Sequence, residues 1–163
     1  MLEKIVVEQL SSLLNHKGYS SYLYLQMSAW CADQGFSGSH ALLRRCAQKK
    51  QQQFLAIFDY INDTGALPVI GTLHAPPYEF SALPDLFQQI YEQEQAISER
   101  IACLVCQVLN TQDYFTFNFL QTLVTEQRQE EKRFKTLLDQ CEYLGENRQA
   151  IFCLDHALKH SES

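Results

Sequence analysis

Residues 66–80 read ALPVIGTLHAPPYEF, and this stretch decides how the chain folds. It contains three of the four prolines and a glycine among mixed apolar residues, a composition typical of a non-helical connection. Fifteen residues are far more than two neighbouring antiparallel helices need, but they can carry a chain along the whole length of a helix bundle. The stretch therefore predicts a long crossover between two halves of the chain.

The first half predicts two long helices. One covers about 3–33, and the next runs to about Thr64, where Gly65 is a C-cap signal. Between them lies a glycine- and serine-containing turn, in which Ser37 or Ser39 is the expected N-cap of the second helix.

The second half predicts two more long helices and a short one. Ser81 is expected to start the third helix, which runs to about Leu109, with a proline and an aspartate in its first turn. After a short turn the fourth helix continues to about 144 and ends at Gly145. A last amphipathic helix is expected over about 147–159. Because alternation of period two is not sustained anywhere, the predicted fold class is all-α.

Composition and charge disfavour several classes of function. A chain of 163 residues, 46% of them hydrophobic, fits a single domain covering 1–163, with a four-helix bundle over about 3–144. The formal net charge of −6 disfavours nucleic acid as a partner. No apolar run approaches the roughly 20 residues that span a bilayer, and the N-terminus lacks the layout of a secretory signal. We expect a cytoplasmic protein without a membrane partner.

The cysteines are expected to be reduced, because cytoplasmic thiols stay so. The Cys103–Cys106 pair has CxxC spacing but lies in a continuous predicted helix, so core packing is favoured over a metal or redox role. Cys46 falls on an inner stripe, where a thiol could bind soft metals. The six are Cys31, Cys46, Cys103, Cys106, Cys141 and Cys153.

Polar side chains interrupt the apolar stripe of every long helix about halfway along. In a bundle of helices of equal length, such interruptions fall in one central layer. A buried polar layer is costly unless its members satisfy one another, so its occurrence on all four helices indicates a functional or formerly functional site. The residues are Lys17, Lys50, Gln53, Glu94, Gln127 and Glu130.

Several segments carry a resemblance to a known family. They are Tyr19-Ser-Ser-Tyr-Leu-Tyr24, Gln26-Met-Ser-Ala-Trp-Cys31, Leu43-Arg-Arg45, Phe58-Asp-Tyr60, Asp63-Thr-Gly65, Gln112-Asp-Tyr114, Phe117-Asn-Phe-Leu-Gln121, Glu126-Gln127 and Glu130-Glu-Lys132. Together they resemble the bacterial non-haem ferritins, over about 1–158 and without obvious gaps. The resemblance implies a ferritin-like four-helix bundle in a hollow homo-oligomer of 24 subunits, with the short fifth helix lining fourfold channels.

In that family each bundle oxidises iron at two metal positions before mineral forms inside the cage. The resemblance places the ligands at a glutamate on the first helix, a Glu-x-x-His on the second, and a glutamate on each of the third and fourth. This chain has Lys17 at the first position and Lys50 and Gln53 at the second-helix pair, which leaves Glu94 and Glu130. A protonated amine offers no lone pair to a metal ion and repels it. We expect Lys17 and Lys50 to pair with Glu94 and Glu130, with no intact di-iron centre.

Two other metal sites of such proteins also look altered. The accessory iron site of the bacterial family corresponds here to Lys49, Glu126, Gln129 and Glu130. Together with the remaining di-iron position Glu94, a residual iron site would then consist of Glu94, Glu126 and Glu130. The axial methionine of haem-binding relatives corresponds to Gln51, so no haem is expected. Mini-ferritins, which lack a fifth helix, are disfavoured for that reason.

Three functions remain open at this point. The first is a non-catalytic iron-storage subunit, similar to vertebrate light chains, that could co-assemble with a catalytically intact ferritin. The second is a slow ferroxidase that uses substitute ligands, and the third is a structural or regulatory paralogue without iron chemistry. His156 and His160, spaced by four, either lie on an exposed C-terminus or approach the fourfold channel that the resemblance implies.

Overall fold

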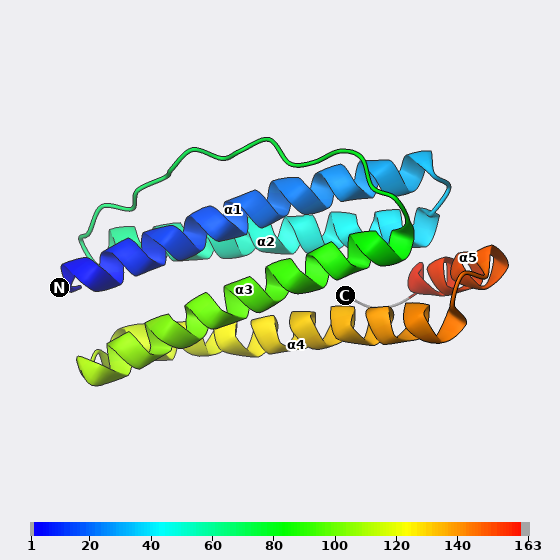
Figure 1. Ribbon diagram of the computed structural model, residues 1–163. Helices are drawn as coiled ribbons and strands as arrows, with labels where there is room; N and C mark the ends of the chain where they lie inside the picture. The colour runs from blue at the N-terminus through cyan, green and yellow to red at the C-terminus, as the bar shows by residue number, and fades with distance from the viewer. Residues whose placement is uncertain (1, 161–163) are drawn as a thin grey trace.

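The computed structural model describes residues 2–160 and consists of five helices. They are α1 (Lys4–Asp33), α2 (Ser37–Asp63), α3 (Leu83–Asn110), α4 (Tyr114–Leu144) and α5 (Arg148–Leu158). The pairs α1–α2 and α3–α4 lie side by side as antiparallel hairpins, and the 64–82 connection runs along α1 from one end of the bundle to the other (Figure 1). The all-α ferritin-like bundle with a long crossover and a short fifth helix is confirmed.

The core consists of two apolar clusters, one toward each end of the bundle. The cluster near α5 includes Met27 and Phe87, and the cluster at the other end includes Leu10 and Ile101. On each long helix the predicted polar interruption lies between the positions that feed the two clusters, so the polar layer divides the core. No helix among residues 2–160 has a stretch both long and apolar enough to cross a bilayer.

Asn15 fixes the crossover to α1. Its amide nitrogen donates to the carbonyl of Val69 at 2.9 Å, and its amide oxygen accepts from the backbone N–H of Gly71 at 2.8 Å. One side chain thus satisfies both a donor and an acceptor of a segment that has no secondary structure to do so. The contact explains how an irregular connection keeps a defined path.

The N-terminus of α2 is capped differently from the sequence-based expectation. Ser37 and Ser39 both lie inside the helix, and the N-cap residue Phe36 makes no side-chain cap bond. Asp155 of α5 caps the helix instead, because its carboxylate accepts from the backbone N–H of Gly38 at 3.1 Å and of Ser39 at 2.7 Å. A carboxylate at this position also interacts favourably with the helix dipole.

The start of α3 also differs by two residues from the expectation. The helix begins at Leu83 with Ala82 as N-cap, while Ser81 lies outside it and donates its hydroxyl to Asp85. Gly145 ends α4 in a left-handed conformation, with φ of 64°, as expected of a glycine that follows a helix.

The docking of α5 predicts a sensitive glycine. A Cβ at position 38 would lie 1.7 Å from the carbonyl oxygen of Asp155, so Gly38→Ala should displace α5. We expect a loss of about 1–3 kcal/mol in the free energy of unfolding and faster proteolysis before α5. Gly71→Ala is the control, since its Cβ would meet Asn15 at an ordinary 3.6 Å. Equal stability of the two variants would contradict this account of the docking.

Candidate functional site

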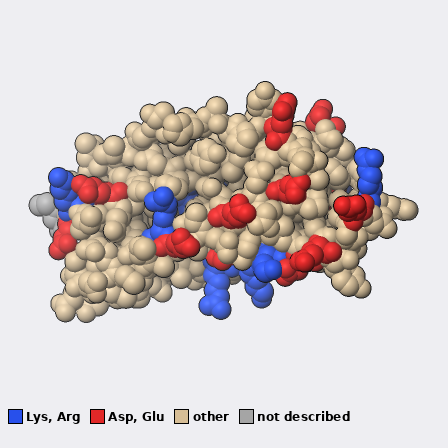
Figure 2. Space-filling model, in the orientation of Figure 1, with Lys and Arg blue, Asp and Glu red and all other residues tan. Residues whose placement is uncertain are grey.

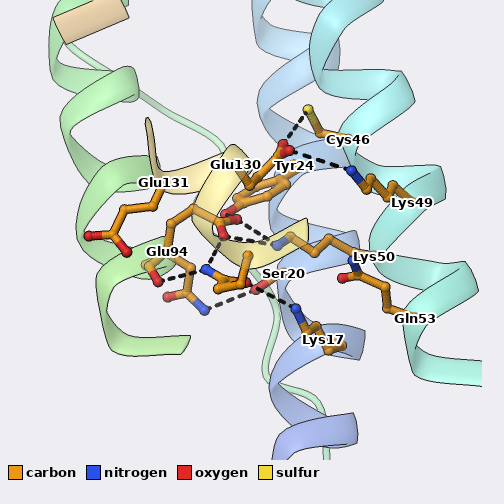
Figure 3. Close-up of polar contacts among 12 residues, drawn as sticks. Lys17, Ser20, Tyr24, Cys46, Lys49, Lys50, Gln53, Glu94, Glu130 and Glu131 are labelled. Atoms are coloured by element: carbon orange, nitrogen blue, oxygen red, sulfur yellow. Dashed lines mark hydrogen bonds and ion pairs between the residues drawn. The ribbon is translucent and has the colours of Figure 1, made fainter. Parts of the chain in front are cut away.

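The structure brings the six predicted polar residues together in the middle of the bundle. Lys17 comes from α1, Lys50 and Gln53 from α2, Glu94 from α3, and Glu130 from α4 (Figure 3). Gln127 also lies on α4. All six are buried, and Lys17 and Glu94 have no exposed surface at all. Such a layer is stable only where its members bond to one another, which makes each contact informative.

Glu94 is the centre of the layer and is contacted from the other three long helices. Lys50 Nζ lies 2.8 Å from one carboxylate oxygen and 2.9 Å from the other. Tyr24 donates its hydroxyl to Oε1, and the amide of Gln127 donates to Oε2 at 2.7 Å and to the backbone carbonyl of Glu94 at 2.9 Å. Both oxygens are therefore occupied by donors from the protein.

The electrostatics of Glu94 follow from these contacts. Burial alone would raise the pKa of its carboxyl group, but the charge and hydrogen bond of Lys50 and the hydrogen bond of Tyr24 outweigh burial. The pKa ends below its ordinary value, so Glu94 is ionised. Tyr24 shows the opposite effect, because burial and the adjacent Glu94 charge raise the pKa of its phenol well above the ordinary value.

Lys17 is not paired with a carboxylate, which corrects part of the expected pairing. Among the described residues its Nζ donates to Gln127 Oε1 at 3.1 Å. Burial, and then the positive charge of Lys50, lower the pKa of the Lys17 amine well below its usual range. The expected ion pair is present for Lys50 and Glu94 only, because Lys50 and the hydrogen-bond donors of the layer already surround the carboxylate.

Glu130 faces a different set of partners from those expected. The thiol of Cys46 donates to its Oε1 at 3.1 Å, and burial followed by the Glu130 charge raises the pKa of that thiol. The nearest cations to Oε2 are Arg133 at 3.7 Å and Lys49 at 4.0 Å, and this oxygen accepts no hydrogen bond within the described part of the chain. Glu130 thus belongs to the edge of the layer rather than to its centre.

The three carboxylates of the suggested residual iron site are turned to separate partners. Glu94 is bound by Lys50, Glu130 by Cys46, and Glu126 accepts from the amide of Gln53 at 2.5 Å. Across residues 2–160, no group of three or more His, Cys, Asp or Glu side chains is arranged to hold a metal ion.

Tyr24 is the functional-layer residue that sequence reasoning missed. Its hydroxyl contributes to the polar layer while its ring packs near Phe134. Its position seven residues after Lys17, two helical turns on the same face, is the signal that could have placed it there.

The expectation that Cys103 and Cys106 pack in the core is wrong. Both are exposed, because the buried stripe of α3 passes through Ile101 and Leu104 and leaves them on the outer side. No disulfide joins any of the six cysteines, all of which lie in the described part of the chain. His156 and His160 are exposed near the end of α5, and their rings lie 6.1 Å apart.

Comparison with known proteins decides the family. Residues 7–144 match the ferritin-like domain. The chain belongs to the ferritin family. It is 43% identical over 158 residues to a bacterial non-heme ferritin of Escherichia coli O6:H1, a match that covers 97% of this chain and 96% of the relative. A probable bacterial non-heme ferritin-like protein of Haemophilus influenzae is 42% identical over 158 residues, again 97% and 96% of the two chains.

Solved ferritin structures agree with the fold of the whole chain. The open-pore ferritin of the archaeon Archaeoglobus fulgidus superposes with a TM-score of 0.94 at 28% identity, covering 99% of each chain. The ferritin match therefore extends from α1 through α5. The chain is a ferritin-type subunit.

The Lys50–Glu94 pair predicts strong coupling between the two residues. Lys50→Met leaves the Glu94 charge buried without its cation, and should lower the free energy of unfolding by about 3–5 kcal/mol. The double variant Lys50→Met/Glu94→Gln should regain much of this loss, because no buried charge remains unpaired. Denaturant unfolding of the single and double variants measures the coupling. Additive losses would show that the two groups do not depend on each other.

The Lys17 amine predicts a pH dependence of stability. Its pKa is lowered in the folded state, so the unfolded chain binds more protons and stability rises with pH up to the ordinary lysine pKa of about 10.4. The stability of Lys17→Met relative to the unmodified protein should therefore fall as pH rises from neutrality toward that value. Lys4→Met, at a side chain that is 91% exposed, should show a flat difference. A flat difference for Lys17→Met as well would mean that its pKa is ordinary.

Proposed function

We propose that this chain is an iron-storage ferritin subunit in which an ion-paired polar layer replaces the di-iron oxidation site. The observation that carries the proposal is the position of Lys50, whose ammonium lies 2.8 and 2.9 Å from the two oxygens of Glu94. A fixed cation thus occupies the carboxylate that the ferritin resemblance assigns to iron. A metal ion would have to displace Lys50 before it could use Glu94.

The remaining positions support the same reading. Iron of either valence takes oxygen and imidazole ligands, and Lys17, Lys50 and Gln53 stand where the resemblance places two glutamates and a histidine. Gln127 donates to Glu94 and accepts from Lys17. In this proposal iron is the cargo of the assembled protein rather than a substrate oxidised within the bundle.

The storage role implies an assembly. We infer a homo-oligomeric cage, of 24 subunits by resemblance, with a possible mixed form that includes a catalytically intact ferritin, in the cytoplasm and without haem. In such a mixture the intact subunit would oxidise Fe(II), and this chain would supply shell and interior surface. The inference is supported by matches to ferritins over 97% of the chain and by a complete α5.

A slow ferroxidase is the second candidate, and one observation favours it. Glu130 Oε2 is buried and accepts no hydrogen bond from any described residue, beside the thiol of Cys46. A carboxylate oxygen in this state could take part in a weak iron site together with Glu126. The third reading, a structural paralogue without iron chemistry, differs from both in that the purified protein would take up no iron.

Oxidation kinetics test these readings. Fe(II) is added anaerobically to the purified protein, air is admitted, and the early ferric absorbance is recorded against buffer. We expect the rate of autoxidation in the unmodified protein. The variant Lys17→Glu/Lys50→Glu/Gln53→His should gain a fast phase of up to two irons per chain, because it restores the ligand types. A matched variant with Lys4→Glu, Lys135→Glu and Gln95→His changes the same residue types on the surface and should gain nothing.

The outcomes separate the three functions. Fast stoichiometric oxidation by the unmodified protein would replace the storage reading with the enzyme. Slow oxidation followed by no retained iron, measured as metal content after gel filtration, would favour the structural paralogue. Slow oxidation with iron retained in the protein is the result that the proposal requires.

A further inference from the structure

A polar groove lies between α2 and α4, immediately outside the central layer. Its volume is about 530 Å³, and Cys46, Gln53 and Glu126 form the part of its wall that touches the layer. At roughly 30 Å³ per water molecule, this space holds a small hydrated ion with ease. The groove is therefore a candidate binding site in its own right, separate from the closed layer beneath it.

Three cations line this groove. They are Arg45 and Lys49 of α2 and Arg133 of α4. The side chains of Lys49 and Arg133 are 32% and 26% exposed, so each is partly buried in the wall but open to solvent. Exposed amides of Gln48 and Gln52 add further hydrogen-bond donors at the rim.

The charge of this region is opposite to that of the whole chain. The protein carries a net charge of −6, yet residues 44–49 and 128–135 contain seven of its thirteen lysines and arginines. Basic side chains gather at the lower edge of the space-filling view, below the middle of α4 (Figure 2). A basic patch on an acidic protein attracts small anions more than it attracts cations.

The described carboxylates near the groove leave Lys49 and Arg133 without a carboxylate hydrogen bond. Among the described residues that line the groove, Glu126 is the one carboxylate; it is half-buried and bonded to Gln53. The buried Glu130 belongs to the layer and accepts from Cys46 of the groove wall. Arg133 and Lys49 approach Glu130 Oε2 only to 3.7 and 4.0 Å, which is beyond hydrogen-bond distance. Lys49 and Arg133 therefore lie near a negative charge without a hydrogen bond to it, and one N–H of Arg133 donates to Cys46 Sγ at 3.9 Å.

We propose that this groove binds a tetrahedral oxyanion, with inorganic phosphate as its ligand. Lys49 and Arg133 supply charge-assisted hydrogen bonds from opposite walls, and a guanidinium matches the oxygens of a phosphate in a bidentate fashion. The groove wall contains no aromatic side chain on which a nucleobase could stack, which favours the inorganic ion over a nucleotide. The inference does not depend on whether the chain oxidises or stores iron.

The groove coincides with the accessory iron site that the ferritin resemblance implies. The ferritin resemblance places an accessory iron site at Lys49, Glu126, Gln129 and Glu130, where two acidic positions have become a lysine and a glutamine. The exchange removes ligands for a hard cation and adds donors for an anion. The groove thus has the opposite ligand preference from the site that relatives would hold there.

Phosphate binding to the iron-free protein tests this directly. Titration calorimetry with inorganic phosphate should give about one saturable site per chain, displaced by sulfate but not by chloride at equal ionic strength. Lys49→Gln and Arg133→Gln should each weaken binding about tenfold, because each removes one charged donor. Lys135→Gln removes the same charge from α4 outside the groove, where Lys135 pairs with Asp139, and should change the affinity less than about twofold.

A second measurement uses the unmodified protein and so does not depend on the folding of a variant. Bound phosphate should slow acylation of Lys49, followed by mass spectrometry, several-fold relative to acylation of Lys135. Absence of saturable binding, equal loss in all three variants, or no protection of Lys49 at saturating phosphate would overturn the proposal. Adenosine monophosphate serves as a comparison, and tighter binding of this nucleotide than of phosphate would overturn the assignment to an inorganic ion.

Discussion

The structure depends on one buried carboxylate. Glu94 lies on α3 and is bonded by Tyr24 of α1, Lys50 of α2 and Gln127 of α4, so a single side chain connects all four long helices. This buried charge is tolerable only because the surrounding donors bond to both of its oxygens. The registry of the four helices is therefore fixed at their midpoint, where apolar packing alone would allow them to slide. The two apolar clusters then pack outward from this point toward the two ends of the bundle.

Much of the fold could be predicted from the sequence, because helical periodicity and the positions of proline and glycine are local signals. The crossover, the five helices and six members of the polar layer follow from proline and glycine positions and from stripes with interruptions, whereas Tyr24 was missed. Partners within the layer could not be predicted, since they depend on rotamers and on the relative rotation of helices: Lys17 turned out to bond to Gln127. The cap on α2 was missed for a related reason, because Asp155 lies more than a hundred residues away in the chain. Cys103 and Cys106 were misplaced because core packing was inferred from their place in a continuous helix, without asking which face they take beside the stripe of Ile101 and Leu104.

The closed layer and the open groove place the same residue types in different surroundings. Within the layer an ammonium lies on a carboxylate and leaves no vacancy for another cation. Outside it, Lys49 and Arg133 approach Glu130 but remain partly solvated. Dehydrated ion pairs are tightly coupled, whereas solvated ion pairs exchange partners easily. The same residue types therefore form a rigid contact in the layer and an adaptable surface in the groove.

The docking of α5 has a consequence for how subunits meet. Asp155 bonds to the first turn of α2, and Gly38 allows the two backbones to touch, so α5 is already held in place within a single chain. A helix ordered before association loses little conformational freedom when it contacts a neighbour. Any assembly that uses this end of the bundle would therefore join preformed surfaces. Subunits of different sequence could replace one another there as long as each keeps the contact between Asp155 and α2. In such an assembly, a contact made inside one subunit would decide which subunits are compatible with one another.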